Sequence, residues 1–111
     1  MTKDYSEEVM QLIKNYKKEN IVFGKEIDFL VKRIGISKEE IEKEILDCKN
    51  LFLTEKQFKD GETRYALFFI YGKRKGRQYV IIFREKEMRI ITIFPLGRKT
   101  LKRYTKKGLN R

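Results

Sequence analysis

The sequence has no histidine and no tryptophan, a single cysteine (Cys48) and a single proline (Pro95). The lack of histidine excludes the Ser/His/Asp arrangement of nucleophilic catalysis. A single cysteine cannot form a disulfide within the chain. With one cysteine and no histidine, the ligand sets of the usual zinc sites are also excluded. The seven glycines are scattered and form neither a Walker loop nor a dinucleotide fingerprint. Any chemistry must therefore rely on arginine, lysine, tyrosine or carboxylates, and we expect no metal and no cofactor.

Long apolar runs are also missing. No segment approaches the roughly 18 apolar residues that a membrane-spanning helix needs, and no secretory leader is recognisable. A hydrophobic content of 41% with 13% aromatics is nevertheless enough for a packed core. We therefore expect one soluble, cytoplasmic domain spanning residues 1–111, with no membrane partner.

Acidic residues are scarce in only one half of the chain. Residues 1–60 contain 12 basic and 13 acidic side chains, whereas residues 61–111 contain 15 basic and 3 acidic ones. The formal net charge of +11 therefore comes from the second half. This asymmetry predicts a polyanionic partner for that half, with nucleic acid the first expectation and an acidic protein the second.

Three amphipathic helices are predicted before residue 49. The segments are 5–20, 25–34 and 37–48; Gly35 ends the second, and Ser37 with Glu40 forms a capping box at the start of the third. The apolar residues at helical spacing are Val9, Leu12, Ile13 and Tyr16, then Ile27, Leu30, Val31 and Ile34, then Ile41, Ile45 and Cys48.

The pattern then changes to short runs rich in β-branched and aromatic residues. Four strands are predicted at 51–58, 64–72, 77–84 and 88–95. Short connections favour an antiparallel meander of the last three. Beyond Gly97, the segment "RKTLKRYTKK" suits a short helix on the sheet edge. The fold class is therefore α+β: N-terminal helices, a four-stranded antiparallel sheet and a short C-terminal helix.

Two groups in the third predicted helix are interpreted as structural. The acids Glu39, Glu40, Glu42 and Glu44 alternate with lysines and lie outside the apolar stripe, so we expect a solvated face. Cys48 continues the apolar stripe and is expected to be a buried thiol rather than a nucleophile.

A winged-helix fold is an alternative interpretation of "VKRIGISKEEIEKEI" and the strands after it. In that interpretation the third helix would contact DNA, although its acidic side chains would be repelled by phosphates. The basic excess of the chain lies elsewhere.

Arginines and lysines of the second half are the candidate site residues. Arg64 and Arg89 lie within or at the start of apolar strands, where an arginine is costly unless it is paired or functional. The hairpin cations Lys73, Arg74, Lys75 and Arg77 are either phosphate contacts or a solubilising turn.

Three stretches resemble small RelE-superfamily toxins of type II toxin–antitoxin systems, particularly BrnT-like proteins. They are "KRIGISKEEIEKEI", "GETRYALFFIYGKRKGRQYVIIF" and "MRIITIFPLGRKTLKRY". The resemblance covers roughly residues 27–104. It implies a toxin-like core at 21–104, with residues 1–20 as an additional helix and 105–111 as a basic tail.

The resemblance also implies an activity and its residues. Family members of known activity are RNases that cleave mRNA without metal. By position, Arg64, Arg89, Arg98 and Tyr104 match catalytic residues, and Thr92 matches a strand hydroxyl. Arg33 occupies the place of the BrnT-like histidine. The residues expected to bind nucleic acid are Lys73, Arg74, Lys75, Arg77, Lys99, Lys102 and Arg103.

The chemistry is feasible without histidine. Attack by the RNA's own 2′-hydroxyl needs positioning, cationic stabilisation of the phosphorane and proton transfer. Arginines suit the second requirement, and Tyr104 among cations is the candidate base. We therefore expect an endoribonuclease with RNA and an acidic antitoxin as partners. The alternatives are a non-enzymatic nucleic-acid-binding protein, either winged-helix or an inactive toxin fold, and a protein-interaction domain for an acidic partner.

Overall fold

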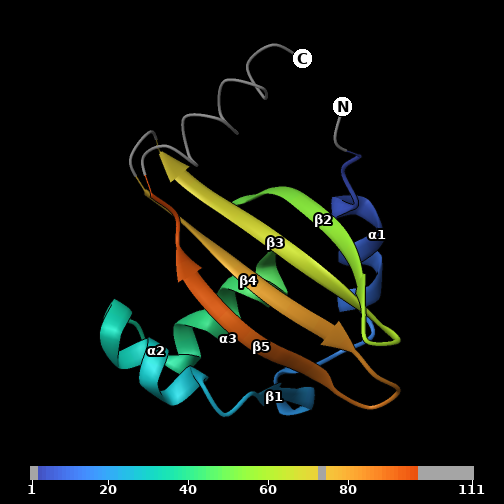
Figure 1. The fold of residues 1–111 in the computed structure, drawn as a ribbon, viewed down its shortest axis with the longest axis horizontal. Coiled ribbons are helices and arrows are strands. Elements are labelled where there is room, and N and C mark those ends of the chain that lie inside the picture. The colour runs from blue at the N-terminus through green and yellow to red at the C-terminus, as the bar shows by residue number, and fades with distance from the viewer. Residues whose placement is uncertain (1–2, 73–74, 98–111) are drawn as a thin grey trace.

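The computed structural model describes residues 3–72 and 75–97, which form an α+β fold (Figure 1). The described elements are α1 (Ser6–Ile13), a 3-10 turn (Lys18–Asn20), β1 (Ile21–Phe23), α2 (Ile27–Ile34), α3 (Lys38–Asp47), β2 (Leu51–Lys59), β3 (Glu62–Gly72), β4 (Lys75–Phe83) and β5 (Met88–Pro95). The predicted C-terminal helix lies outside the described residues.

The helix boundaries follow the local signals in the sequence. Gly35 adopts a left-handed conformation with φ of 81° and ends α2, as predicted. At the start of α3 the hydroxyl of Ser37 accepts a hydrogen bond of 3.1 Å from the backbone N–H of Glu40. α1 is shorter than predicted, since its helical part ends at Ile13.

The sheet has five strands in the order β1-β5-β4-β3-β2. Strands β2 to β5 form an antiparallel meander. The predicted meander comprised only the last three strands, and β2 extends it by pairing with β3. The prediction of a purely antiparallel four-stranded sheet is wrong, because β1 adds to the edge in parallel, with Ile21 opposite Met88. Three residues are too few to show a strand pattern, and the partner strand is remote in sequence.

Gly24 permits the chain to leave β1 close to β5. Its backbone N–H donates a 2.8 Å hydrogen bond to the carbonyl of Ile90. A Cβ at this position would lie 3.1 Å from the same oxygen, so a larger residue would push β1 away.

The two faces of the sheet differ. The helices α1, α2 and α3 lie on one side of the sheet, called the helix face (Figure 1). Their apolar residues pack on alternate residues of the strands. This core comprises Val9, Ile13, Ile21, Ile27, Ile41, Ile45, Tyr65, Leu67, Phe69, Tyr79, Ile81, Met88, Ile90 and Ile93. The opposite face, called the open face below, carries a smaller cluster of Leu53, Ala66, Phe68 and Val80. No described helix is long and apolar enough to cross a membrane.

Candidate nucleic-acid interface

Arg64 and Arg89 share the open face of the sheet. Along β3, Tyr65 and Leu67 belong to the helix-face core, so alternation turns Arg64 the other way. In β5, Arg89 lies between the core residues Met88 and Ile90 and is likewise on the open face. The structure thus brings together two of the predicted site residues.

The strand register places these arginines on either side of one residue of β4. Arg89 pairs with Ile82, and Arg64 lies one residue beyond the pair of Tyr65 and Ile81. Two inter-strand spacings correspond to about 10 Å between the backbones of the two arginines. Thr92 pairs with Val80 and lies on the same face, further along β5.

The two guanidinium groups have different surroundings. Nε of Arg89 donates a 3.1 Å hydrogen bond to Oε2 of Glu87. Nε of Arg64 is buried and has no hydrogen-bond partner within the described residues, while Gln57 of β2 is its neighbour in the register. A buried donor without a partner costs about 1 to 3 kcal/mol.

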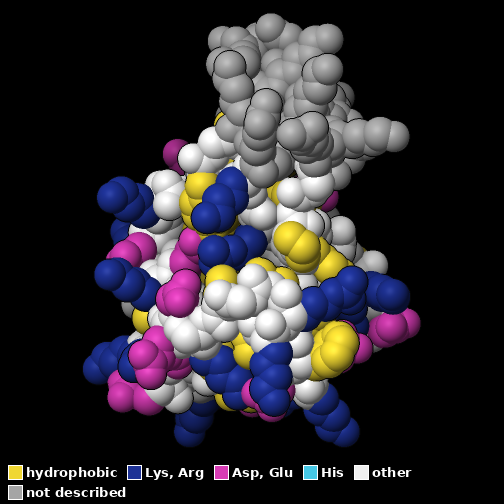
Figure 2. Space-filling view, turned by 90° about the vertical axis from the view of Figure 1, so that its left-hand side faces the viewer, with side chains coloured by type: hydrophobic (Ala, Val, Ile, Leu, Met, Phe, Trp, Pro, Cys, Tyr) yellow, Lys and Arg dark blue, Asp and Glu magenta, His cyan; other side chains and the backbone are white. Residues whose placement is uncertain are grey.

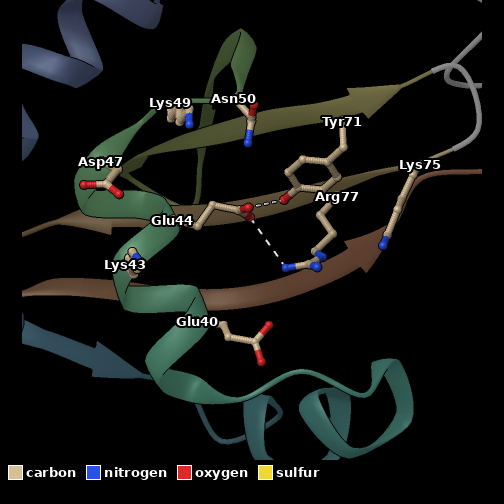
Figure 3. A pocket seen from close by; sticks show the side chains of 9 residues that line it. All are labelled: Glu40, Lys43, Glu44, Asp47, Lys49, Asn50, Tyr71, Lys75 and Arg77. Carbon is tan, nitrogen blue, oxygen red and sulfur yellow. Dashed lines mark hydrogen bonds and ion pairs between the residues drawn. The ribbon is translucent and has the colours of Figure 1, made fainter.

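Lys75 and Arg77 lie at the other end of the sheet, on the helix face. Arg77 lies about five residues from Ile82 along β4, which corresponds to roughly 16 Å. Both side chains line a pocket of about 320 Å³ between α3 and the ends of β3 and β4 (Figure 3). The pocket is lined by Glu40, Lys43, Glu44, Asp47, Lys49, Asn50, Tyr71, Lys75 and Arg77.

Glu44 organises one wall of this pocket. Its carboxylate accepts hydrogen bonds from the hydroxyls of Tyr71 and Tyr79, the latter at 2.6 Å. Nη1 of Arg77 lies 3.7 Å from Oε1 of Glu44, and the guanidinium lies 5.3 Å from the ring centre of Tyr71 (Figure 3). Only 15% of the Glu44 side chain and 17% of the Arg77 side chain are exposed.

The two tyrosines act as hydrogen-bond donors. Burial, reinforced by the hydrogen bond to Glu44, raises the pKa of Tyr71 and of Tyr79 well above the usual value for tyrosine. Both hydroxyls therefore remain protonated at neutral pH and are unsuited to act as general bases.

The expectation of a fully solvated acidic face on α3 is wrong for Glu42 and Glu44. Glu39 and Glu40 are exposed, as expected, whereas the Glu42 side chain is only 14% exposed and its carboxylate lies 3.9 Å from Nζ of Lys18. Glu44 follows Ile41 by three residues and therefore belongs beside the apolar stripe. That spacing, together with tyrosines in the strands that follow, was the signal in the sequence that Glu44 is partly buried.

Cys48 packs against the helix-face core, as predicted, and caps α3 in a left-handed conformation with φ of 55°. Its thiol donates a 3.0 Å hydrogen bond to the carbonyl of Ile45. Burial, with the nearby Asp47 carboxylate, raises the pKa of this thiol to about 11. The thiolate is the reactive form, so Cys48 is a poor nucleophile.

We therefore expect the native protein to react slowly with a disulfide reagent at pH 8. Relative to a thiol with the usual pKa of 9.0, the thiolate population falls by roughly 100-fold. The labelling rate should increase about tenfold per pH unit toward pH 11. Equal rates in the native and the urea-unfolded protein would contradict this assignment.

The remaining predicted site residues lie outside the described residues. They are Lys73, Arg74, Arg98, Lys99, Lys102, Arg103 and Tyr104. The predicted residues that are described form two pairs, Arg64 with Arg89 and Lys75 with Arg77, on opposite faces of the sheet. Within residues 3–72 and 75–97, no cluster of three or more acidic or cysteine side chains is arranged to hold a metal ion.

Comparisons with known proteins identify no relative. No protein-family model, no curated protein and no solved structure matches the chain.

Proposed function

We propose that the protein is a RelE/BrnT-like toxin that binds RNA on its open face and cleaves it without metal, through the RNA's 2′-hydroxyl. The observation that carries the proposal is the placement of Arg64 and Arg89 on either side of Ile82. Their backbones lie about 10 Å apart on one face of the sheet, and arginine side chains are long enough for both to reach one phosphate group or neighbouring phosphates of one RNA strand. The net charge of +12 in residues 61–111, from 15 basic and 3 acidic side chains, supplies the long-range attraction.

The reaction assigns roles to four residues. The 2′-oxygen attacks the neighbouring phosphorus, the bond to the 5′-oxygen breaks, and the departing 5′-oxygen takes a proton from water. The products are a 2′,3′-cyclic phosphate and a 5′-hydroxyl. Arg64 and Arg89 stabilise the negative charge of the phosphorane. Arg98 adds a third cation, and Tyr104 accepts the proton of the 2′-hydroxyl. Tyr71 and Tyr79 are not substitutes, since Glu44 holds both hydroxyls as donors.

A non-enzymatic RNA-binding role is the second candidate. It is favoured by Arg33, an exposed residue of α2 that replaces the BrnT-like histidine. Without that histidine, proton transfer depends on Tyr104 alone. The winged-helix version of this alternative has less support. α3 buries Ile41 and Ile45 against the sheet, and the side of the molecule where α2 lies carries charges of both signs (Figure 2).

An acidic antitoxin is the proposed protein partner. Carboxylates placed over the basic residues would block the RNA and neutralise the charge of the second half of the chain. This partner follows from the same charge excess that supports RNA binding.

Expression in a bacterial host tests the proposed function. We expect growth arrest and loss of intact mRNA on induction, with both effects reduced by Arg98→Ala and by Tyr104→Phe. If Tyr104→Phe binds RNA normally but leaves it intact, tyrosine acts in proton transfer. A wild-type protein that is harmless and leaves RNA intact, with and without ribosomes, would contradict the enzymatic proposal and leave the binding role.

A further inference from the structure

We infer that the pocket between α3 and the ends of β3 and β4 is a phosphate-binding site, separate from the open face. Its ligand is a phosphate monoester, as found at the end of an RNA strand or on a mononucleotide. That the phosphate belongs to RNA rests on the proposed function, whereas the affinity of the pocket for phosphate follows from the side chains that line it.

Cations reach the pocket from three parts of the chain. Lys43 belongs to α3, Lys49 to the connection that follows it, and Lys75 and Arg77 to β4 (Figure 3). A solvated charge run would lie along one element, whereas these four converge on one hollow. Convergent cations from separate elements are the arrangement that binds a compact anion.

Arg77 is the preorganised member of the set. Its guanidinium is held between the Glu44 carboxylate and the ring of Tyr71, and its Nη1 also donates to the Tyr79 hydroxyl at 3.4 Å. A fixed planar fork loses little conformational entropy when it binds phosphate. Lys75, two residues earlier on the same strand, supplies a flexible point charge beside it.

The acids of the pocket leave a positive balance. Glu44 is offset by Arg77 and by its two tyrosine donors. The exposed Glu40 and Asp47 lie three residues before and four residues after Lys43 on α3, at the spacing of helical ion pairs. With Arg77 and Glu44 cancelled, three lysines face two carboxylates. A monoester carries nearly two negative charges at neutral pH.

The size of the pocket admits more than a phosphate group. A volume of about 320 Å³ lies at the lower end of small-molecule sites. Asn50 and Tyr71 add an amide and a partly exposed aromatic ring to the lining. These groups suit the sugar and base attached to the phosphate, so a nucleotide unit is the best match.

Binding of short RNAs with different ends tests the inference. One six-nucleotide RNA is prepared in three forms, with a 5′-phosphate, with a 3′-phosphate and with neither. Any position that the protein cleaves carries a 2′-deoxy nucleotide, so that the RNA stays intact. Adenosine 5′-monophosphate is the second probe. We expect about tenfold tighter binding of one phosphorylated end. The variant Lys43→Ala/Lys49→Ala should remove this preference and the nucleotide binding, since both lysines are exposed and their loss should not affect folding. Lys25→Ala/Lys32→Ala is the matched control.

The outcomes separate this inference from the proposed function. Loss of the end preference in the pocket variant alone supports the site. Binding of the nucleotide without any binding of RNA also supports the pocket and contradicts the proposed RNA partner. The inference is overturned if the wild type shows neither an end preference nor nucleotide binding, or if the pocket variant retains both.

Discussion

Replacing Glu44 with alanine is expected to lower the free energy of unfolding by about 3 to 5 kcal/mol. The substitution leaves the largely buried guanidinium of Arg77 without its carboxylate partner and removes the acceptor of two tyrosine hydroxyls. Breaking one side of such a pair costs more than the pair contributes, because the remaining charge is poorly solvated. Urea unfolding followed by circular dichroism measures the change.

Two variants distinguish this effect from a general response of α3. Glu44→Gln keeps an acceptor for a tyrosine hydroxyl but loses the charge, so an intermediate loss is expected. Glu39→Ala alters an exposed acid of the same helix and should change stability by less than about 0.5 kcal/mol. If Glu44→Ala is no more destabilising than Glu39→Ala, the described cluster does not hold α3 to the sheet.

Removing both open-face arginines is expected to weaken RNA binding by about 100-fold or more. A charge-assisted hydrogen bond contributes roughly 1.5 to 3 kcal/mol, so each guanidinium accounts for about tenfold or more in affinity. The slope of log K against log salt should decrease by about 0.7 for each lost phosphate contact with a single strand. The measurement is a salt titration of RNA binding by Arg64→Ala/Arg89→Ala.

Removing any cation weakens RNA binding somewhat, because the net positive charge falls. A matched variant separates this general effect from the loss of the specific contacts made by Arg64 and Arg89. Lys25→Ala/Lys32→Ala also removes two positive charges, but from exposed positions outside the proposed interfaces. It should bind RNA nearly as the wild type does. Equal losses of affinity in the two double variants would indicate that RNA binding depends only on the net charge. The open face with Arg64 and Arg89 would then not be a binding surface.

Much of the fold was predictable because its signals are local. Gly35 and Ser37 mark helix boundaries through backbone conformation and capping, and the four long strands have enough residues to show their pattern. β1 was not predictable as part of the sheet, because Ile21–Phe23 is short and its pairing with β5 depends on a distant partner.

The candidate sites were predictable in part for the same reason. An arginine inside an apolar strand is a local anomaly, so Arg64 and Arg89 could be selected as candidates from sequence, although their position opposite Ile82 on one face depends on the strand register. Glu44 was missed because it was grouped with the other acids of α3, and because its partners Tyr71, Tyr79 and Arg77 come from two strands. Its role depends on how α3 sits on the sheet.

Incubation of the purified protein with RNA tests metal-independent cleavage most directly, in EDTA when ribosomes are absent and in magnesium buffer when they are present, because ribosomes dissociate without magnesium. We expect cleavage that resists the chelator, yields 2′,3′-cyclic phosphate and 5′-hydroxyl ends, and fails when the 2′-hydroxyl at the cleaved position is replaced by hydrogen. RNA that remains intact under both conditions, or cleavage that the 2′-deoxy substitution does not prevent, would contradict metal-independent cleavage through the 2′-hydroxyl.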